Sequence, residues 1–405
     1  MFMWRDERSR DMDGRPETLG EARLSFAAPE TELGEGVVDR LPETLSELGV
    51  DAPLVVTDEG VASAGVLDAA LVGLDTDPTI HHATTEPAVD DFGALPDASV
   101  DGVVAVGGGS VLDTAKVAAA LLAHGGSASD SLGVDEVPGP VAPTVAVPTT
   151  IGTGSQATQT AVVSYEGVKR GMSDEHLRPD VALVDPALTH DLPRDVTARS
   201  GFDAFVHALE SLTALDHREV PPRPINYQGA NPVTRPLSRR ALELIYGAYE
   251  RAVADGDERA ARRQMSLGSH LAGTAFSNAG LGAVHALAST VGGMTGRPHG
   301  ECLGASLTAG LRYNRPVRRE EYAAVARTLG VAGAGDPDDA VDALVAECDR
   351  VREAGGLPGS FADLGLGPDD ADEILRKTLL QKRRIATNPR PVDEDLREQV
   401  VRALE

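Results

Sequence analysis

The 405-residue sequence is short of cysteine, of lysine and of long apolar runs. Its two cysteines exclude a disulfide framework and a cysteine-rich metal site. No run approaches the roughly 18 consecutive apolar residues that a membrane-spanning helix requires. The charged N-terminal residues 1–17 also lack the apolar core of a signal peptide. We therefore expect a cytoplasmic protein.

Positive charge is scarce as well. Lysine and arginine total 37 against 63 acidic residues, a net charge of −26. This balance argues against nucleic acids and anionic membrane surfaces as partners. An acidic, lysine-poor surface predicts a halophilic protein that works in concentrated salt, where charge repulsion is screened within a few ångströms. A GC-rich coding bias, which also exchanges lysine for arginine, is the alternative.

The length accommodates two domains. In the first half, short apolar runs predict buried strands over residues 54–56, 103–106, 144–147 and 181–184. Because helical stretches separate these runs, we expect a parallel sheet with both faces covered.

From about residue 196 the apolar spacing is helical almost throughout. Further helices are predicted over residues 202–215, 241–253, 262–276, 338–354, 369–383 and 392–404. We therefore predict an α/β domain over residues 1–195 and an all-α domain over residues 196–405.

A glycine turn follows the second predicted strand directly and precedes a helical pattern. It consists of Gly107, Gly108, Gly109 and Ser110. Glycines let a backbone approach a phosphate closely, and a helix N-terminus presents free N–H groups. Tight turns also use glycine for purely steric reasons, but the position between strand and helix favours a nucleotide.

A second turn, PTTIGTGS over residues 148–155, follows the third predicted strand. Its hydroxyl and amide groups predict contacts with a diphosphate or a ribose; a helix N-cap at Thr153 or Ser155 is the alternative. Two such turns at the ends of parallel strands favour one shared ligand crevice. Asp58, directly after the first strand, is predicted to accept hydrogen bonds from an adenosine ribose. Its charge favours NAD over NADP, whose 2′-phosphate it would repel.

Acidic and histidine side chains in the second half predict a metal site. Asp203 and His207 lie four residues apart on one helix face, and Glu210 continues that stripe. His285 and His299 lie on either side of a glycine-containing stretch, so we expect them on different elements that converge. Three imidazoles and one carboxylate suit Fe(II) or Zn(II) better than Mg(II). A mere surface pair of Asp203 and His207 is the alternative.

Residues 215–236 contain five prolines and no helical period. A stretch of this length without regular structure is usually functional or mobile. It contributes Arg218, Arg223 and Arg235 to a strongly acidic protein.

Six segments, in order along the chain, resemble the iron-containing alcohol dehydrogenase family. They are GGGSVLDTAK (107–116), PTTIGTGSQAT (148–158), RPDVALVDPALTHDLP (178–193), SGFDAFVHALES (200–211), GSHLAGTAFSNAGLGAVHALA (268–288) and RPHGECLGA (297–305). The resemblance implies a dehydroquinate synthase-like architecture. In it, an α/β NAD-binding domain and an all-α domain for metal and substrate enclose a cleft.

The resemblance also implies roles for individual residues. The implied metal ligands are Asp203, His207, His285 and His299. The implied cofactor contacts, besides Asp58 and the first glycine turn, are Asp113, Thr149, Thr150, Thr153 and Lys169. Many family members carry a further histidine four residues after the third ligand, where this chain has Ser289. A water, the Ser289 hydroxyl or the metal would then mediate proton transfer. We therefore count Ser289 with His285 and His299 as catalytic.

Three stretches resemble the hydroxyacid–oxoacid transhydrogenase branch of the family more closely. They are SYEGVK (164–169), RPINYQGANPVTRP (223–236) and TLLQKRRIATNPRPVDEDL (378–396). That branch exchanges hydride between 4-hydroxybutyrate and 2-oxoglutarate. Arg218, Arg223 or Arg235 would then pair with a substrate carboxylate; pairing with the acidic surface is the alternative.

Together these features predict metal-dependent hydride transfer between NAD(H) and an alcohol/aldehyde or hydroxyacid/semialdehyde pair, with Fe(II) or Zn(II). The transhydrogenase reaction is the first alternative. A non-catalytic nucleotide- or metal-binding paralogue is the second. The intact ligand set argues against reduction of a maleylacetate-type acid. The family resemblance implies a homodimer or larger assembly.

Overall fold

A twisted parallel sheet forms the centre of the first half of the molecule. The computed structural model describes residues 24–94, 99–166, 168–220 and 226–405. Within these residues six strands pair in the order β1-β9-β6-β4-β2-β3, all in parallel. Their bounds are β1 (Glu30–Leu33), β2 (Pro53–Thr57), β3 (Thr79–His82), β4 (Gly102–Gly107), β6 (Thr144–Pro148) and β9 (Val181–Val184). The four predicted strands are confirmed as β2, β4, β6 and β9.

Alternate side chains of these inner strands enter two separate apolar cores, one on each face of the sheet. Val55, Val104 and Val145 face α1 (Leu41–Leu48) and α3 (Val66–Ala70). Their neighbours Leu54, Val103 and Ala146 face α4 (Gly109–His124). A strand buried on both faces needs an apolar residue at every position, which is why these strands are uninterrupted apolar runs.

Edge strands and a small hairpin complete this half. β1 and β3 are mostly exposed and lack an apolar run, so the sequence pattern did not reveal them. β7 (Thr160–Tyr165) and β8 (Val168–Ser173) form an antiparallel pair, and β5 (Gly133–Val134) joins β8. Short α2 (Glu59–Ser63) follows β2.

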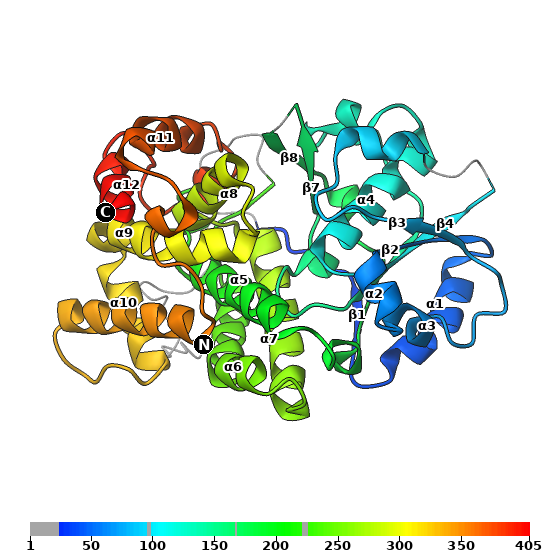
Figure 1. Cartoon of the computed structure of the whole chain (residues 1–405), viewed down its shortest axis with the longest axis horizontal. Coiled ribbons are helices and arrows are strands. Elements are labelled where there is room, and N and C mark those ends of the chain that lie inside the picture. Colours follow the sequence, from blue (N-terminus) through cyan, green and yellow to red (C-terminus); the bar gives the residue numbers. More distant parts are fainter. Residues whose placement is uncertain (1–23, 95–98, 167, 221–225) are drawn as a thin grey trace, which may run out of the picture.

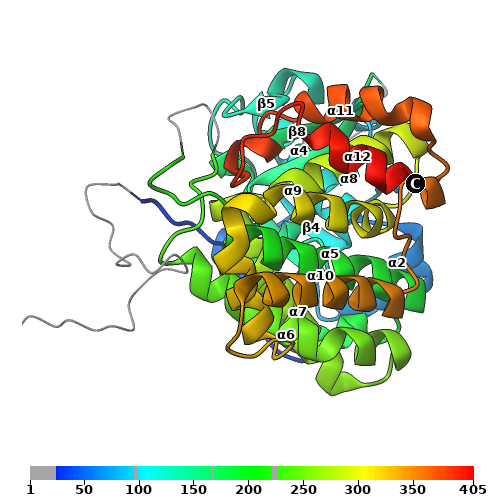
Figure 2. The same cartoon turned by 90° about the vertical axis from the view of Figure 1, so that its left-hand side faces the viewer.

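The second half is helical, as predicted (Figures 1 and 2). Its helices are α5 (Arg194–Thr213), α6 (Thr234–Ala254), α7 (Arg259–Ala279), α8 (Ala283–Thr295), α9 (His299–Thr328), α10 (Pro337–Ala354), α11 (Ala371–Leu379) and α12 (Leu396–Leu404). Helix α5 is the central one: residues 201–213 are all buried, among α6, α7 and α9. Helix α9 bends at Arg318, two residues after Pro316. No helix in the described residues is long and apolar enough to span a membrane.

The two halves contact each other through backbone atoms at glycine residues, without intervening side chains. The turn after β6 packs directly on α5 and α7: a Cβ on Gly152 would lie 2.1 Å from the Ser200 carbonyl oxygen, and one on Gly273 would lie 2.7 Å from the Gly154 Cα. These glycines therefore let the second predicted turn meet the helices. The predicted division at residues 195/196 falls within the first turn of α5 and stays a prediction.

We expect Gly152→Ala to lower the free energy of unfolding by about 1–3 kcal/mol, because the methyl group must push apart two packed backbones. Denaturant unfolding at fixed metal content measures this change. Gly247→Ala on α6 is the control, because a Cβ there meets nothing within 4 Å and alanine favours a helix. Equal stabilities of the two variants would contradict the close contact.

Candidate active site

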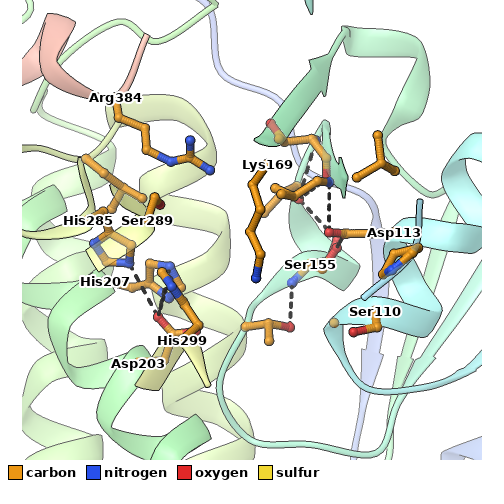
Figure 3. A pocket seen from close by; sticks show the side chains of 18 of the residues that line it. Ser110, Asp113, Ser155, Lys169, Asp203, His207, His285, Ser289, His299 and Arg384 are labelled. Carbon is orange, nitrogen blue, oxygen red and sulfur yellow. Dashed lines mark hydrogen bonds and ion pairs between the residues drawn. The ribbon is translucent and has the colours of Figure 1, made fainter. Parts of the chain in front are cut away.

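A cavity of about 230 Å³ lies between the sheet half and the helical half. Figure 3 shows Asp203 and the three histidines on one side and Ser110, Asp113 and Ser155 on the other. Lys169 and Arg384 extend into the space between these groups. Both predicted half-sites therefore face one cavity.

The four predicted metal-ligating side chains come together from three helices. Helix α5 contributes Asp203 and His207 one turn apart, α8 contributes His285, and His299 is the first residue of α9. The Asp203 Oδ1 lies 3.3 Å from His285 Nε2, 3.4 Å from His207 Nε2 and 4.0 Å from His299 Nε2. Possible ligand atoms of Asp203, His207 and His285 all lie within 4.8 Å of one another.

Burial and mutual charge set the protonation of this cluster. Burial would raise the pKa of Asp203, but the surrounding imidazoles lower it to about 2. Burial lowers the pKa of His207 to about 3 and that of His299 to about 4. For His285, burial is outweighed by hydrogen bonds with Asp203 and Glu210, and its pKa is raised to about 9.

Glu210 fixes the orientation of one of these imidazoles. Its Oε2 lies 2.5 Å from His285 Nδ1, and its Oε1 accepts a hydrogen bond of 2.9 Å from the Val284 backbone N–H. The other ring nitrogen of His285 is thereby turned towards Asp203. The α5 stripe pointed to Glu210 from sequence, but its partner on α8 was not foreseen.

The donor set fits a borderline divalent cation. Three imidazole nitrogens and one carboxylate oxygen suit Fe(II) or Zn(II), whereas Mg(II) prefers oxygen ligands throughout. A carboxylate held beyond the second nitrogen of His285 is typical support for a metal-binding imidazole. The residues present therefore fit the metal that the sequence predicts.

The first glycine turn leads into α4, whose N-terminus faces the cavity. Gly107 ends β4, Gly108 is the N-cap of α4, and Gly109 is its first residue. A Cβ on Gly109 would lie 2.7 Å from the Thr153 side chain, so close packing of the two turns also requires glycine here. Gly109 and Ser110 line the cavity, which leaves the helix N-terminus accessible to an anionic ligand.

Asp113 joins the two turns. Its carboxylate accepts hydrogen bonds from Ser155 Oγ at 2.6 Å and from the Val162 backbone N–H at 2.9 Å. The buried Lys116 Nζ lies 3.9 Å from Asp113 and donates to Ser155 Oγ at 2.7 Å. Burial raises the pKa of Asp113, against the effect of Lys116. Asp113 therefore holds the wall of the cavity in shape.

The remaining predicted cofactor contacts differ in position. Thr153 and Lys169 line the cavity, and Lys169 Nζ donates to Glu86 at 2.8 Å. Thr149 and Thr150 lie in the turn behind this wall, where the Thr149 N–H donates to the Gly107 carbonyl at 3.0 Å. Asp58 lies outside the cavity lining and caps α2, accepting from the Val61 N–H at 2.9 Å.

The arginines predicted to bind a substrate carboxylate lie elsewhere. Arg218 Nε and Arg235 Nη2 donate to the buried carboxylate of Asp216, at 2.6 Å and 2.9 Å. Neither lines the cavity, so the structure favours the alternative pairing with an acidic residue. Arg223 lies outside the described residues. Arg383 and Arg384, from the segment after α11, line the cavity instead.

Ser289 lies one turn after His285 on α8 and lines the same cavity. Only 8% of its surface is exposed. The Ser289 hydroxyl group therefore lies beside the histidine cluster, where the sequence predicts it.

An α/β half and a helical half therefore enclose one cavity with a candidate metal cluster, as in an enzyme active site, and comparison with known proteins identifies the family. Two models match: iron-containing alcohol dehydrogenase over residues 28–186, and the C-terminal part of the Fe-containing alcohol dehydrogenase family over residues 197–405. The chain belongs to the iron-containing alcohol dehydrogenase family and is an oxidoreductase of that family.

Individual relatives span most of the chain. It is 34% identical to the NAD-dependent methanol dehydrogenase of Bacillus methanolicus, covering 90% of this chain and 95% of that one. It is 32% identical to a probable mitochondrial hydroxyacid-oxoacid transhydrogenase of Dictyostelium discoideum, covering 73% and 60%. A solved 1,3-propanediol oxidoreductase superposes with a TM-score of 0.87 at 29% identity, covering 94% and 100%.

Glu210→Gln should weaken metal binding by about 10- to 100-fold, because the amide carries no charge with which to hold the His285 ring. Titration of metal-free protein with Zn(II) against a competing chelator measures the affinity directly. Glu243→Gln, at an exposed ion pair with Arg240 on α6, is the control. Unchanged affinity in Glu210→Gln would contradict the orienting role.

Proposed function

We propose that this protein transfers hydride between NAD(H) and an alcohol/aldehyde or hydroxyacid/semialdehyde pair, with a divalent metal, Fe(II) before Zn(II). One observation carries the proposal. A single cavity is lined by Asp203 and three histidines on one side and by the N-terminus of α4 on the other. A substrate beside Asp203 and the three histidines and a dinucleotide at the N-terminus of α4 would therefore share one enclosed space.

Asp203, His207, His285 and His299 would hold the metal, and Glu210 would keep His285 in place. A bound divalent cation polarises a carbonyl oxygen and stabilises alkoxide charge. The nicotinamide supplies the hydride chemistry. Phe276 and Leu281 contribute apolar walls, which exclude water and strengthen the electrostatic interactions.

The Ser289 hydroxyl would serve as the proton carrier. It lies one turn from His285, at the cavity wall, where an alkoxide formed by hydride transfer needs a proton. A hydroxyl group can both donate and accept hydrogen bonds, so it can pass a proton between the substrate oxygen and water. His285 and His299 act through the metal that they would bind.

Anaerobically prepared protein with Fe(II) or Zn(II), in strong salt, should oxidise NADH in the presence of a short aldehyde. Chelation should abolish this turnover, and His285→Ala should lose metal and activity together, because the substrate oxygen is then no longer polarised. Metal analysis and NADH absorbance measure both effects. An active, metal-free His285→Ala variant would contradict the metal role.

Similarity to the Dictyostelium transhydrogenase supports hydride exchange between two acids as a second candidate function. The two reactions differ in their need for free cofactor. In a transhydrogenase, a 2-oxoacid restores oxidation of 4-hydroxybutyrate without added NAD, whereas a simple dehydrogenase requires stoichiometric NAD. The same purified protein serves for both assays.

We further propose a preference for NAD over NADP. Asp58 follows β2 at the carboxyl edge of the sheet, where a negative charge would oppose a 2′-phosphate. Asp58→Asn keeps a side-chain acceptor for the α2 cap but removes the charge. We expect kcat/KM with NADPH to rise about tenfold. Asp68→Asn, at an exposed position of α3, is the control; equal NADPH use by both variants would contradict the role of Asp58.

A cytoplasmic location, activity in concentrated salt and a homodimer or larger assembly stay predictions from the sequence. The acidic composition supports activity in concentrated salt. Sedimentation and activity measurements across a salt series would test the salt requirement and the oligomeric assembly together.

A further inference from the structure

We propose that Arg384 binds a carboxylate of the substrate, so that the enzyme acts on short aldehydes and alcohols that carry an acid group. The inference rests on the proposed function, because hydride transfer is what brings a substrate into this cavity. It moves substrate recognition from the proline-rich segment to the segment after α11.

The guanidinium group of Arg384 has unused hydrogen-bonding capacity. Its Nη1 donates to the neutral Gln381 Oε1 at 2.8 Å. Among the described residues Arg384 forms no ion pair with a carboxylate; the ionisable groups that act on it are Arg383 and Tyr227, and it lines the cavity. By contrast, Arg376 and Arg390, on either side along the chain, pair with Glu373 and Asp395. Arg384 therefore has N–H groups left to bind a ligand.

A second cation strengthens the positive charge in this corner. Arg383 lines the cavity too, and its position is fixed by neutral groups: its Nη2 donates to Thr160 Oγ1 at 2.7 Å, and its guanidinium lies 4.3 Å from the centre of the Tyr227 ring. Burial and the neighbouring charge of Arg383 lower the pKa of Arg384. Within the described residues these two half-buried guanidinium groups form no ion pair with a carboxylate, although the charge of Arg383 acts on Asp135 at longer range. In a chain of net charge −26 they form a site complementary to an anion.

The position of Arg384 favours the substrate over the cofactor as the source of that anion. Figure 3 shows its guanidinium on the side of His285 and Ser289, across the cavity from Ser110 at the start of α4. The glycine turn and the helix N-terminus offer the diphosphate its own site on that opposite side. A carboxylate attached to the reacting carbon chain of a substrate would lie nearer to Arg384 than the cofactor diphosphate would. A planar guanidinium can bind a carboxylate through two parallel hydrogen bonds.

The test compares two four-carbon aldehydes that differ only in the acid group, succinate semialdehyde and butanal. Arg384→Gln should lower kcat/KM for succinate semialdehyde by roughly 10- to 100-fold, the range for charge-assisted hydrogen bonds. Turnover of butanal should change by less than about threefold. Arg384→Lys should restore part of the loss, because it keeps the charge but not the fork of donors.

Lys382→Gln is the matched control, because it removes one positive charge from an exposed position two residues away. Equal aldehyde preference in Arg384→Gln and Lys382→Gln would overturn the proposal. So would a rise in the KM for NADH that is the same with both aldehydes, because the guanidinium would then serve the cofactor.

A binding measurement separates this proposal from the proposed function. Calorimetric titration of metal-free protein with succinate, at one fixed salt concentration, needs no turnover. Binding that is lost in Arg384→Gln and kept in Lys382→Gln supports the anion site even if neither aldehyde is reduced, in which case only the proposed function fails. Binding that is absent, or equal in both variants, overturns the anion site even if butanal is reduced.

Discussion

The buried carboxylate of Asp203 is the charge around which the helical half is organised. An isolated carboxylate in a protein core costs several kcal/mol, so it requires close partners. The three imidazoles supply them, and they must come from α5, α8 and α9 at once. Helix α5 is therefore buried and polar at the same time: Asp203, His207 and Glu210 share its inward stripe, in contact with the other two helices. A metal ion would complete the charge balance that the imidazoles begin.

The second constraint is the bare backbone contact between the halves. Gly152 and Gly154 let the turn after β6 touch α5 and α7 without intervening side chains, so this turn, which forms one wall of the cavity, is held at a fixed distance from Asp203 and the three histidines. Lys116, Asp113 and Ser155 hold the same wall from behind through short hydrogen bonds. Burial lowers the pKa of Lys116 to about 8, whereas Asp113 and Ser155 line the cavity. Hydride transfer depends on the distance and orientation of two ligands, and both are set by this packing.

The sequence predicted those features that one local pattern determines. Strands buried on both faces are apolar at every position, so the sequence predicts β4 directly. Residues one helical turn apart share a face, so the sequence also predicts that Asp203 and His207 lie side by side. Edge strands β1 and β3 have no such pattern, because side chains on both of their faces meet solvent. The residues alone favour His285 and His299 as converging ligands, but the family resemblance adds most of the support, since the convergence of distant residues is a tertiary property. The same limit applies to the arginines: Arg218 and Arg235 look unpaired in sequence, yet Asp216 binds both in the structure.

Whether an arginine is free depends on the carboxylates around it in space. In this acidic chain most candidate arginines are neutralised by a neighbour, and a guanidinium that faces the cavity without one is therefore informative. A neutral aldehyde leaves the half-buried guanidinium of Arg384 hydrated and gains no interaction with it. A carboxylate of suitable length would pair with the guanidinium as water leaves. Selectivity then arises chiefly from the charge-assisted hydrogen bonds that only the acid-bearing aldehyde gains.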